Sequence, residues 1–192
     1  MTDLNVATTP PEYLIDIQPG RRSHCRYGGH SLIPPQPARS QRRAVKIQDS
    51  ISINADRKHV FGVFCDLNNA AANISAITKV EVLAGPASLN IGTKWRETRT
   101  MFGKEATEEM WVTGYEQDVS YVAEAESRGA HYRSEYRFTP EGNGTRVDMT
   151  FEGAPLTFGA RLAGVLGALF AGAAKKALHQ DLVDLKQVCE AS

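Results

Sequence analysis

The sequence lacks the cysteine patterns that disulfide frameworks and cysteine zinc sites require. Its three cysteines, Cys25, Cys65 and Cys189, are odd in number, lie far apart and form no CxxC pair. The N-terminus also lacks an apolar run followed by a small-residue cleavage site, so a secretory signal is not expected. These absences predict a protein of the reducing cytoplasm.

Long hydrophobic runs and catalytic motifs are missing as well. The stretch 158–174 is apolar, but Arg161 and several glycines interrupt it, so no integral membrane span is expected. No GxGxxG, Walker, GxSxG or HExxH pattern occurs, and the sequence therefore gives no support for a cofactor or a metal. His59 and His131 are expected at the surface, without a carboxylate partner.

Charge is balanced overall but uneven along the chain. The formal net charge is zero, and nothing in the composition indicates nucleic acid. Residues 1–44 contain six arginines, three acidic residues and six of the nine prolines. We expect them to form a disordered basic arm, because such a segment buries too little apolar area to offset its loss of conformational entropy. His24, Cys25 and His30 lie in this arm but lack a fourth metal ligand.

From residue 45 the pattern becomes that of one folded domain, which we place at 45–190. Alternating apolar residues from Val45 to Ile53 predict a strand, and the apolar spacing that follows Asp56 predicts two short helices. Runs rich in Val, Thr, Tyr, Phe and Trp then predict an antiparallel meander, with strands at 79–83, 92–102, 105–116, 119–127, 131–139 and 145–152.

A long helix is predicted from Leu156 to about Cys189. Its apolar stripe includes Leu178, Leu182 and Leu185, and its first half is rich in alanine and glycine. Small residues leave space between a helix and a curved sheet where leucines would fill it.

The order of these elements, and three segments within them, resemble a known superfamily. The chain is similar to the START-like, or birch-pollen-allergen, superfamily, and more narrowly to its SRPBCC family of polyketide cyclase/dehydrase and lipid-transport proteins. The resemblance implies an α+β helix-grip fold, in which a curved antiparallel sheet of six to seven strands wraps around the C-terminal helix. It also implies a cavity for an apolar ligand, but no shared catalytic motif. The segments that carry it are VEVLAGPASLNIGTKWRETRTMFGKEATEEMWVTGYE (80–116), YRSEYRFTPEGNGTRVDMTFEG (132–153) and KKALHQDLVDLKQVCE (175–190).

Candidate polar site residues lie on the predicted hairpin around residue 103. A two-residue loop of Gly103 and Lys104 would place Arg99 directly across from Glu108. One face of the hairpin would then contain Trp95, Glu97, Arg99, Met101, Ala106, Glu108, Met110 and Val112. If this face lines the cavity, a glutamate among apolar groups gains a raised pKa for proton transfer. If it faces solvent, its charges form ordinary cross-strand pairs.

The strand at 131–139 and the long helix supply the remaining candidates. Tyr132, Ser134 and Tyr136 alternate with charged residues, which points them inward. The predicted ligand-binding set is Trp95, Glu97, Arg99, Met101, Glu108, Met110, Tyr132, Ser134, Tyr136, Leu162, Leu166 and Phe170, with Glu97 and Glu108 as catalytic candidates.

Three functions remain open at this point. The first is a carrier that binds an apolar or amphipathic small molecule, such as a lipid or a polyketide-like compound. The second is a cofactor-independent cyclase, aromatase or dehydratase that uses Glu97 or Glu108. The third is an interaction module whose groove takes a segment of a partner protein. A monomer or weak homodimer is expected.

Overall fold

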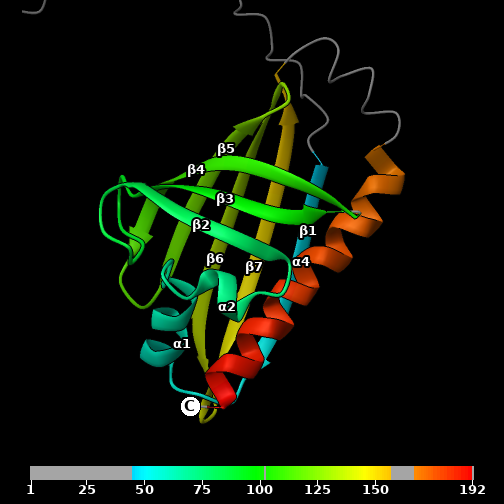
Figure 1. Ribbon diagram of the computed structural model, residues 1–192. Helices are drawn as coiled ribbons and strands as arrows, with labels where there is room; N and C mark the ends of the chain where they lie inside the picture. The colour runs from blue at the N-terminus through cyan, green and yellow to red at the C-terminus, as the bar shows by residue number, and fades with distance from the viewer. Residues whose placement is uncertain (1–44, 102, 157–166, 192) are drawn as a thin grey trace, which may run out of the picture. The chain divides into compact units, whose positions relative to one another are not determined.

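A computed structural model describes residues 45–101, 103–156 and 167–191 of the chain (Figure 1). The predicted arm and the residues 157–166 lie outside the described part. The elements follow one another as β1 (Val45–Ile53), α1 (Arg57–Phe64), α2 (Ala70–Asn73), β2 (Ile77–Ala84), β3 (Lys94–Met101), β4 (Lys104–Glu116), β5 (Ser120–Ser127), β6 (Ala130–Glu141), β7 (Gly144–Pro155) and α4 (Gly167–Glu190).

The strands form one antiparallel sheet of seven strands in the order β1-β7-β6-β5-β4-β3-β2. Each of β2 to β7 pairs with its neighbour in sequence, as expected of a meander, and β1 closes one edge against β7. The sheet curves around one face, which α4 crosses beside β1 (Figure 1). The predicted α+β helix-grip fold is therefore confirmed.

The two short helices close one end of the sheet. Asp56 begins α1, because its side chain accepts hydrogen bonds from the backbone N–H groups of Lys58 and His59. Phe61 and Phe64 then place their rings edge-on against Phe138 of β6, with centroids 5.1 and 5.2 Å away. Aromatic packing therefore fills this end of the inner face.

The long C-terminal helix packs its apolar stripe on the sheet. Leu182, Leu185 and Cys189 are buried in the same core as the aromatic residues of α1. The predicted start at Leu156 is wrong, because β7 continues to Pro155 and the Leu156 N–H still bonds the carbonyl of Gly129 on the β5–β6 turn. No helix in the described part of the chain is long and apolar enough to cross a membrane.

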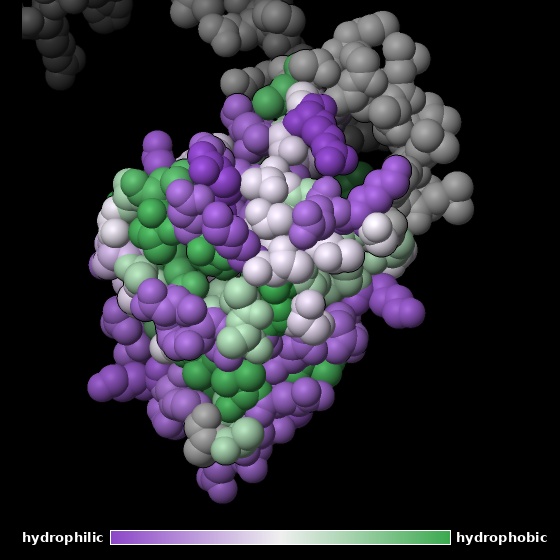
Figure 2. Space-filling model, viewed as in Figure 1, coloured by the Kyte–Doolittle hydropathy of each residue, from purple (hydrophilic) through white to green (hydrophobic). Residues whose placement is uncertain are grey.

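The outer surface is mixed in character. Residues of the sheet's outer face alternate with buried ones along β5 and the first half of β7, as in most half-buried sheets. Figure 2 shows one apolar patch on the left of the view, over the end of β2 and the connection after it. Val82, Leu83 and Ile91 are the exposed large apolar residues of that region.

Candidate functional site

The β3–β4 hairpin has a register different from the predicted one. Met101 pairs with Lys104, so the turn begins one residue earlier than expected and Gly103, at φ 74°, is its second central residue. A glycine with positive φ fits either central position of such a turn, so the sequence did not show whether Gly103 is the first or the second central residue. Glu97 consequently lies across from Glu108, and the predicted pairing of Arg99 with Glu108 is wrong.

The pairing is shifted by two residues from the predicted one. Because side chains alternate between faces with a period of two, each residue of the hairpin stays on its predicted face. Trp95 is 4% exposed and Val112 3%, so the face that they share points into the core. The opposite face holds Arg96 and Glu109, which form an exposed pair with Nη2 2.6 Å from Oε1. The open question of orientation is thereby answered, and Glu97, Arg99 and Glu108 lie on the inner face.

Arg99 forms the centre of an ion-paired triad. Its Nε lies 3.0 Å from Oε1 of Glu97, two residues away on the same strand. Its Nη2 donates to Oδ2 of Asp181 on α4 at 2.7 Å. The side chains of Glu97 and Arg99 on the strand are 15% and 16% exposed, and the side chain of Asp181 on the helix is 10% exposed. We call Glu97, Arg99 and Asp181 the inner triad.

Asp181 is a site residue that the sequence reasoning missed. It follows Leu178 by three residues and precedes Leu185 by four, so it lies on the same face as the apolar stripe of the helix. The signal in the sequence that could have identified it was a carboxylate on the apolar face of a predicted helix. As a whole residue Asp181 is 7% exposed, and it is the only charged residue among the buried ones in the described part of the chain.

Burial controls the electrostatics of the triad. It raises the pKa of Glu97 above its ordinary value, against the opposing effects of Arg99 and the nearby Trp95 indole. It also raises the pKa of Asp181, again against Arg99. For Arg99 itself burial acts to lower the pKa, but Asp181 and Glu97 more than offset it, so the pKa is raised.

Several polar atoms near the triad have no hydrogen-bond partner among the described residues. Among these residues, Asp181 Oδ1 is fully buried and has no donor, and Trp95 Nε1 is fully buried and makes no hydrogen bond of regular geometry, although it acts on Glu97 as a weak donor. The N–H of Arg99 Nε is close to Glu97 but its direction does not make a hydrogen bond. Burying a polar atom without a partner is costly, so such atoms mark a place where a further group can bind.

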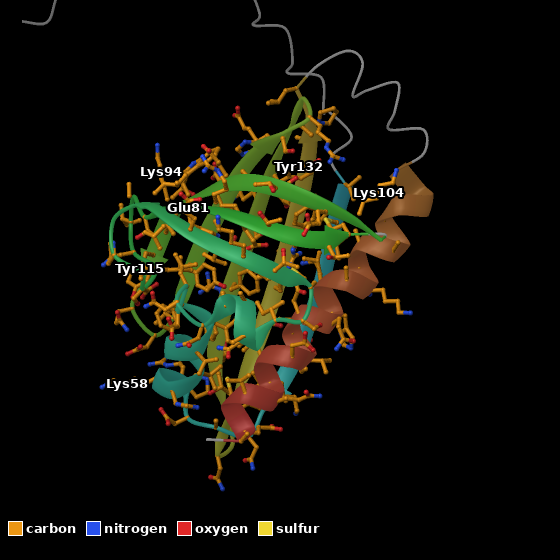
Figure 3. The ribbon with its side chains drawn as sticks, viewed as in Figure 1. Lys58, Glu81, Lys94, Lys104, Tyr115 and Tyr132 are labelled. Carbon is orange, nitrogen blue, oxygen red and sulfur yellow. The ribbon has the colours of Figure 1, made fainter. Side chains whose placement is uncertain are left out.

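The tyrosines predicted to point inward do so. Tyr136 stacks on Tyr121 of β5, a residue the prediction omitted, with centroids 4.8 Å apart. Burial raises the pKa of both phenols, and Asp181 adds to the effect on Tyr136, so both hydroxyls are neutral donors at physiological pH. Tyr132 stacks on Phe151 at 5.7 Å. In Figure 3 it lies in the upper part of the sheet, the same end as Lys104 on the β3–β4 hairpin.

Small residues occupy the middle of the inner face. Ala123 and Ala125 of β5 are buried there, and Ser134 of β6 lies between Ala123 and Phe151 of the neighbouring strands. Gly153 lets the Tyr132 ring approach, since a Cβ on it would lie 3.3 Å from that ring. Short side chains between long aromatic ones take up less of the space over the inner face at this point.

The other predicted site residues are placed as follows. Met101, Glu108, Met110 and Ser134 are half-buried on the inner face of β3, β4 and β6. Leu162 and Leu166 lie outside the described residues, and α4 includes Phe170 without a described side chain. The structure thus brings together the strand residues of the predicted set and adds Asp181 and Tyr121 to them.

The two histidines differ from their predicted surroundings. His131 lies on the outer face with Nε2 3.3 Å from Oε2 of Glu124, so the expected lack of a carboxylate partner is wrong. His59 is half-buried, and its Nε2 is fully buried without a partner in the described part of the chain. No group of three His, Cys, Asp or Glu side chains in this part is arranged to hold a metal ion.

Comparison with known proteins identifies the family. The model described as polyketide cyclase / dehydrase and lipid transport matches residues 44–190. The chain belongs to this family. No curated protein sequence matches the chain.

Solved structures show the same fold at low identity. A START superfamily protein from Mycobacterium smegmatis has a TM-score of 0.63 and 11% identity, over 76% of this chain and 97% of the other. The di-domain ARO/CYC StfQ from the steffimycin biosynthetic pathway has a TM-score of 0.62 and 11% identity, over 77% of this chain and 52% of its own. Ara h 8.0201 has a TM-score of 0.59 and 9% identity, over 78% and 99%. At these identities the likeness concerns the fold.

Proposed function

We propose that the chain binds an apolar or amphipathic small molecule between the inner face of the sheet and α4. The observation that carries this proposal is the inner triad, which is buried beside aromatic residues while Asp181 Oδ1 has no partner among the residues that the structure describes. A protein of this size rarely buries charged groups among apolar ones unless they are paired or have a function. The family match supports the same conclusion, because its description includes lipid transport.

Apolar walls and polar determinants follow from the placement of the side chains. Trp95 lies near Glu97, Tyr136 lies near Asp181 and Arg99, and the short Ser134 belongs to the same inner face. Glu97, Arg99 and Glu108 are the polar groups of the strands, and Asp181 is that of the helix. Apolar contacts would supply most of the affinity and the few polar groups the orientation. The proposed walls are Trp95, Met101, Met110, Tyr132, Tyr136, Leu162, Leu166 and Phe170.

Native mass spectrometry of gently purified protein tests the proposal, followed by extraction under denaturing conditions. We expect a small apolar molecule to accompany the folded chain. Ser134→Phe would place a ring among the short side chains of the inner face and should abolish retention. Thr139→Phe places the same ring on the exposed outer face of the same strand and should retain the molecule as the wild type does.

Two results would contradict binding. One is an unliganded wild-type mass together with failure to bind the neutral fluorescent probe N-phenyl-1-naphthylamine. The other is equal probe binding by Ser134→Phe and the wild type, with both variants unfolding at the temperature of the wild type.

A second candidate function is catalysis of a cyclase or dehydratase type. It is favoured by Glu97, because burial raises the pKa of its carboxyl toward the range in which a general acid or base works. Arg99 at 3.0 Å would stabilise the charge that forms when this carboxyl gives up its proton. The family description includes cyclase and dehydrase activity as well.

Substitutions of one glutamate on each face of the β3–β4 hairpin distinguish catalysis from binding. Glu97→Gln should abolish conversion of a polyketide-like substrate and leave its binding nearly unchanged. Glu109→Gln makes the same change on the exposed outer face of β4 and should leave both intact. Conversion by Glu97→Gln at the wild-type rate would exclude this glutamate as the proton-transfer group and favour a carrier.

A further inference from the structure

We propose that the polar end of the bound molecule is an uncharged hydrogen-bond donor, such as a phenolic or alcoholic hydroxyl, which Asp181 accepts, and that the site rejects carboxylates. This inference rests on the proposed binding function and specifies the chemistry of its ligand. It is carried by the charges of the site and by the atoms that lack partners.

The first argument is the balance of charges on the inner face. Three carboxyl groups share the inner face with the guanidinium of Arg99: those of Glu97 and Asp181 contact it, and that of Glu108 lies on the residue paired with Glu97. Arg99 is already engaged, at 3.0 Å from Glu97 and 2.7 Å from Asp181. A ligand carboxylate that approached Arg99 would lie close to both of these carboxyl groups. Like charges at short range in a poorly hydrated site repel one another strongly.

The second argument is the unused acceptor on the helix. Asp181 is 7% exposed, and its Oδ2 accepts a hydrogen bond from Arg99. Oδ1 is fully buried and has no donor among the described residues. A carboxylate oxygen in this state accepts a hydrogen bond from whatever donor can reach it, and such a charge-assisted bond is stronger than a neutral one.

The third argument is a weakly paired donor nearby. The indole N–H of Trp95 is buried and makes no hydrogen bond of regular geometry in the described part of the chain, although it acts on Glu97 as a donor and lowers the pKa of that carboxyl. A hydroxyl group both donates and accepts a hydrogen bond. It therefore suits a site that holds an unpaired acceptor and a weakly paired donor, whereas an ether supplies no donor and a carboxylate supplies none either.

Three probes of the same shape test this inference by displacement of N-phenyl-1-naphthylamine. They are 2-naphthol, which has a donor, 2-methoxynaphthalene, which has only an acceptor, and 2-naphthoate, which is an anion. For the wild type we expect 2-naphthol to displace the reporter at a concentration about tenfold lower than 2-methoxynaphthalene, the effect of one hydrogen bond to a charged group. 2-Naphthoate should be the weakest of the three.

Matched variants assign the preference to a residue. Asp181→Asn removes the charge of the acceptor, so 2-naphthol and 2-methoxynaphthalene should become nearly equal and 2-naphthoate should bind more tightly. Asp148→Asn makes the same change on the outer face of β7, where Asp148 pairs with Arg146 at 2.9 Å. It should leave the order of the three probes unchanged.

The outcomes separate this inference from the binding function beneath it. If the reporter binds but 2-naphthoate displaces it best, or if all three probes are equal in the wild type, the donor preference is wrong and binding stands. If the preference survives Asp181→Asn, Asp181 is not the acceptor. If neither the reporter nor any probe binds the wild type, the binding function fails and the inference fails with it. The wild-type series is decisive even if Asp181→Asn does not fold.

Discussion

Arg99→Met is the substitution whose effect the structure determines most sharply. Methionine retains the apolar length of the arginine stem but removes the guanidinium that both Glu97 and Asp181 contact, at 3.0 and 2.7 Å. Two carboxyl groups are then left on the inner face without a counter-charge. Removing one partner of a buried ion pair costs about 3–5 kcal/mol of the free energy of unfolding, because the remaining charge is uncompensated. We expect a loss of that size at about neutral pH.

The loss should depend on pH in a defined direction. Burial raises the pKa of Glu97 and of Asp181 in the folded protein. A carboxyl with a raised pKa holds a proton that the unfolded chain has released, so its contribution to stability is fully present below the ordinary pKa and is lost as the pH rises through the raised one. Without Arg99 both pKa values rise further, and the slope approaches about 1.4 kcal/mol per pH unit for each extra proton bound.

Urea unfolding at several pH values, from about pH 5 to about pH 8, measures this effect as the difference in free energy between variant and wild type. The difference should be small at the acidic end, where the carboxyls are protonated, and should grow toward the alkaline end. Arg96→Met is the control, because Arg96 holds two glutamates in the same way on the exposed face of the same strand. It should change stability little and equally at every pH. Equal losses for the two variants, or a loss for Arg99→Met that does not vary with pH, would refute the reasoning.

Other predictions concern the frame around the site. Burial raises the pKa of the Cys65 and Cys189 thiols to about 12, so neither should react with a disulfide reagent in the native state and both should react after unfolding, as thiol titration would show. Asp56→Ala removes the cap of α1 and should lower the free energy of unfolding by about 1 kcal/mol in urea. Gly172→Ala adds a methyl group in open space on α4 and should raise stability by up to about 1 kcal/mol. Gly144→Ala, by contrast, would press its Cβ onto a backbone carbonyl of β1, so its melting temperature should fall well below that of the wild type.

The fold was predictable because the spacing of the apolar residues and the positions of the turn residues indicate the same helices and strands along the chain. Alternation from Val45 to Ile53 gave β1, and the spacing of Phe61 and Phe64 after Asp56 gave α1. The predicted ends of helices and strands were less accurate where the sequence pattern does not mark the change from one element to the next. The predicted strand ended at residue 152 and the predicted helix began at Leu156, yet backbone pairing with β6 continues β7 to Pro155.

The site was predictable only in part, because it combines a strand with a distant helix. The faces of the β3–β4 hairpin follow from alternation and tolerated an error of two residues in register. The partner of Arg99 did not follow, since a pairing between residues 82 positions apart depends on how α4 lies across the sheet. Neighbouring strands suggested Glu108 as that partner, whereas the curvature of the sheet brings Asp181 to it.

The position of Asp181 is fixed by the polar contacts of the helix that carries it. His179 meets Asp49 of β1 with Nδ1 and Oδ2 2.9 Å apart, and Asp184 accepts from the backbone N–H and the hydroxyl of Ser75 at 2.8 and 2.6 Å. Near the end of α4, Glu190 accepts from a backbone N–H just after β1 at 2.7 Å. These contacts lie before and after Asp181 and join α4 to separate parts of the sheet and to the segment before β2. An acceptor held in this way loses little freedom when a ligand binds, so its hydrogen bond contributes more fully to affinity and to selectivity among ligands of similar shape.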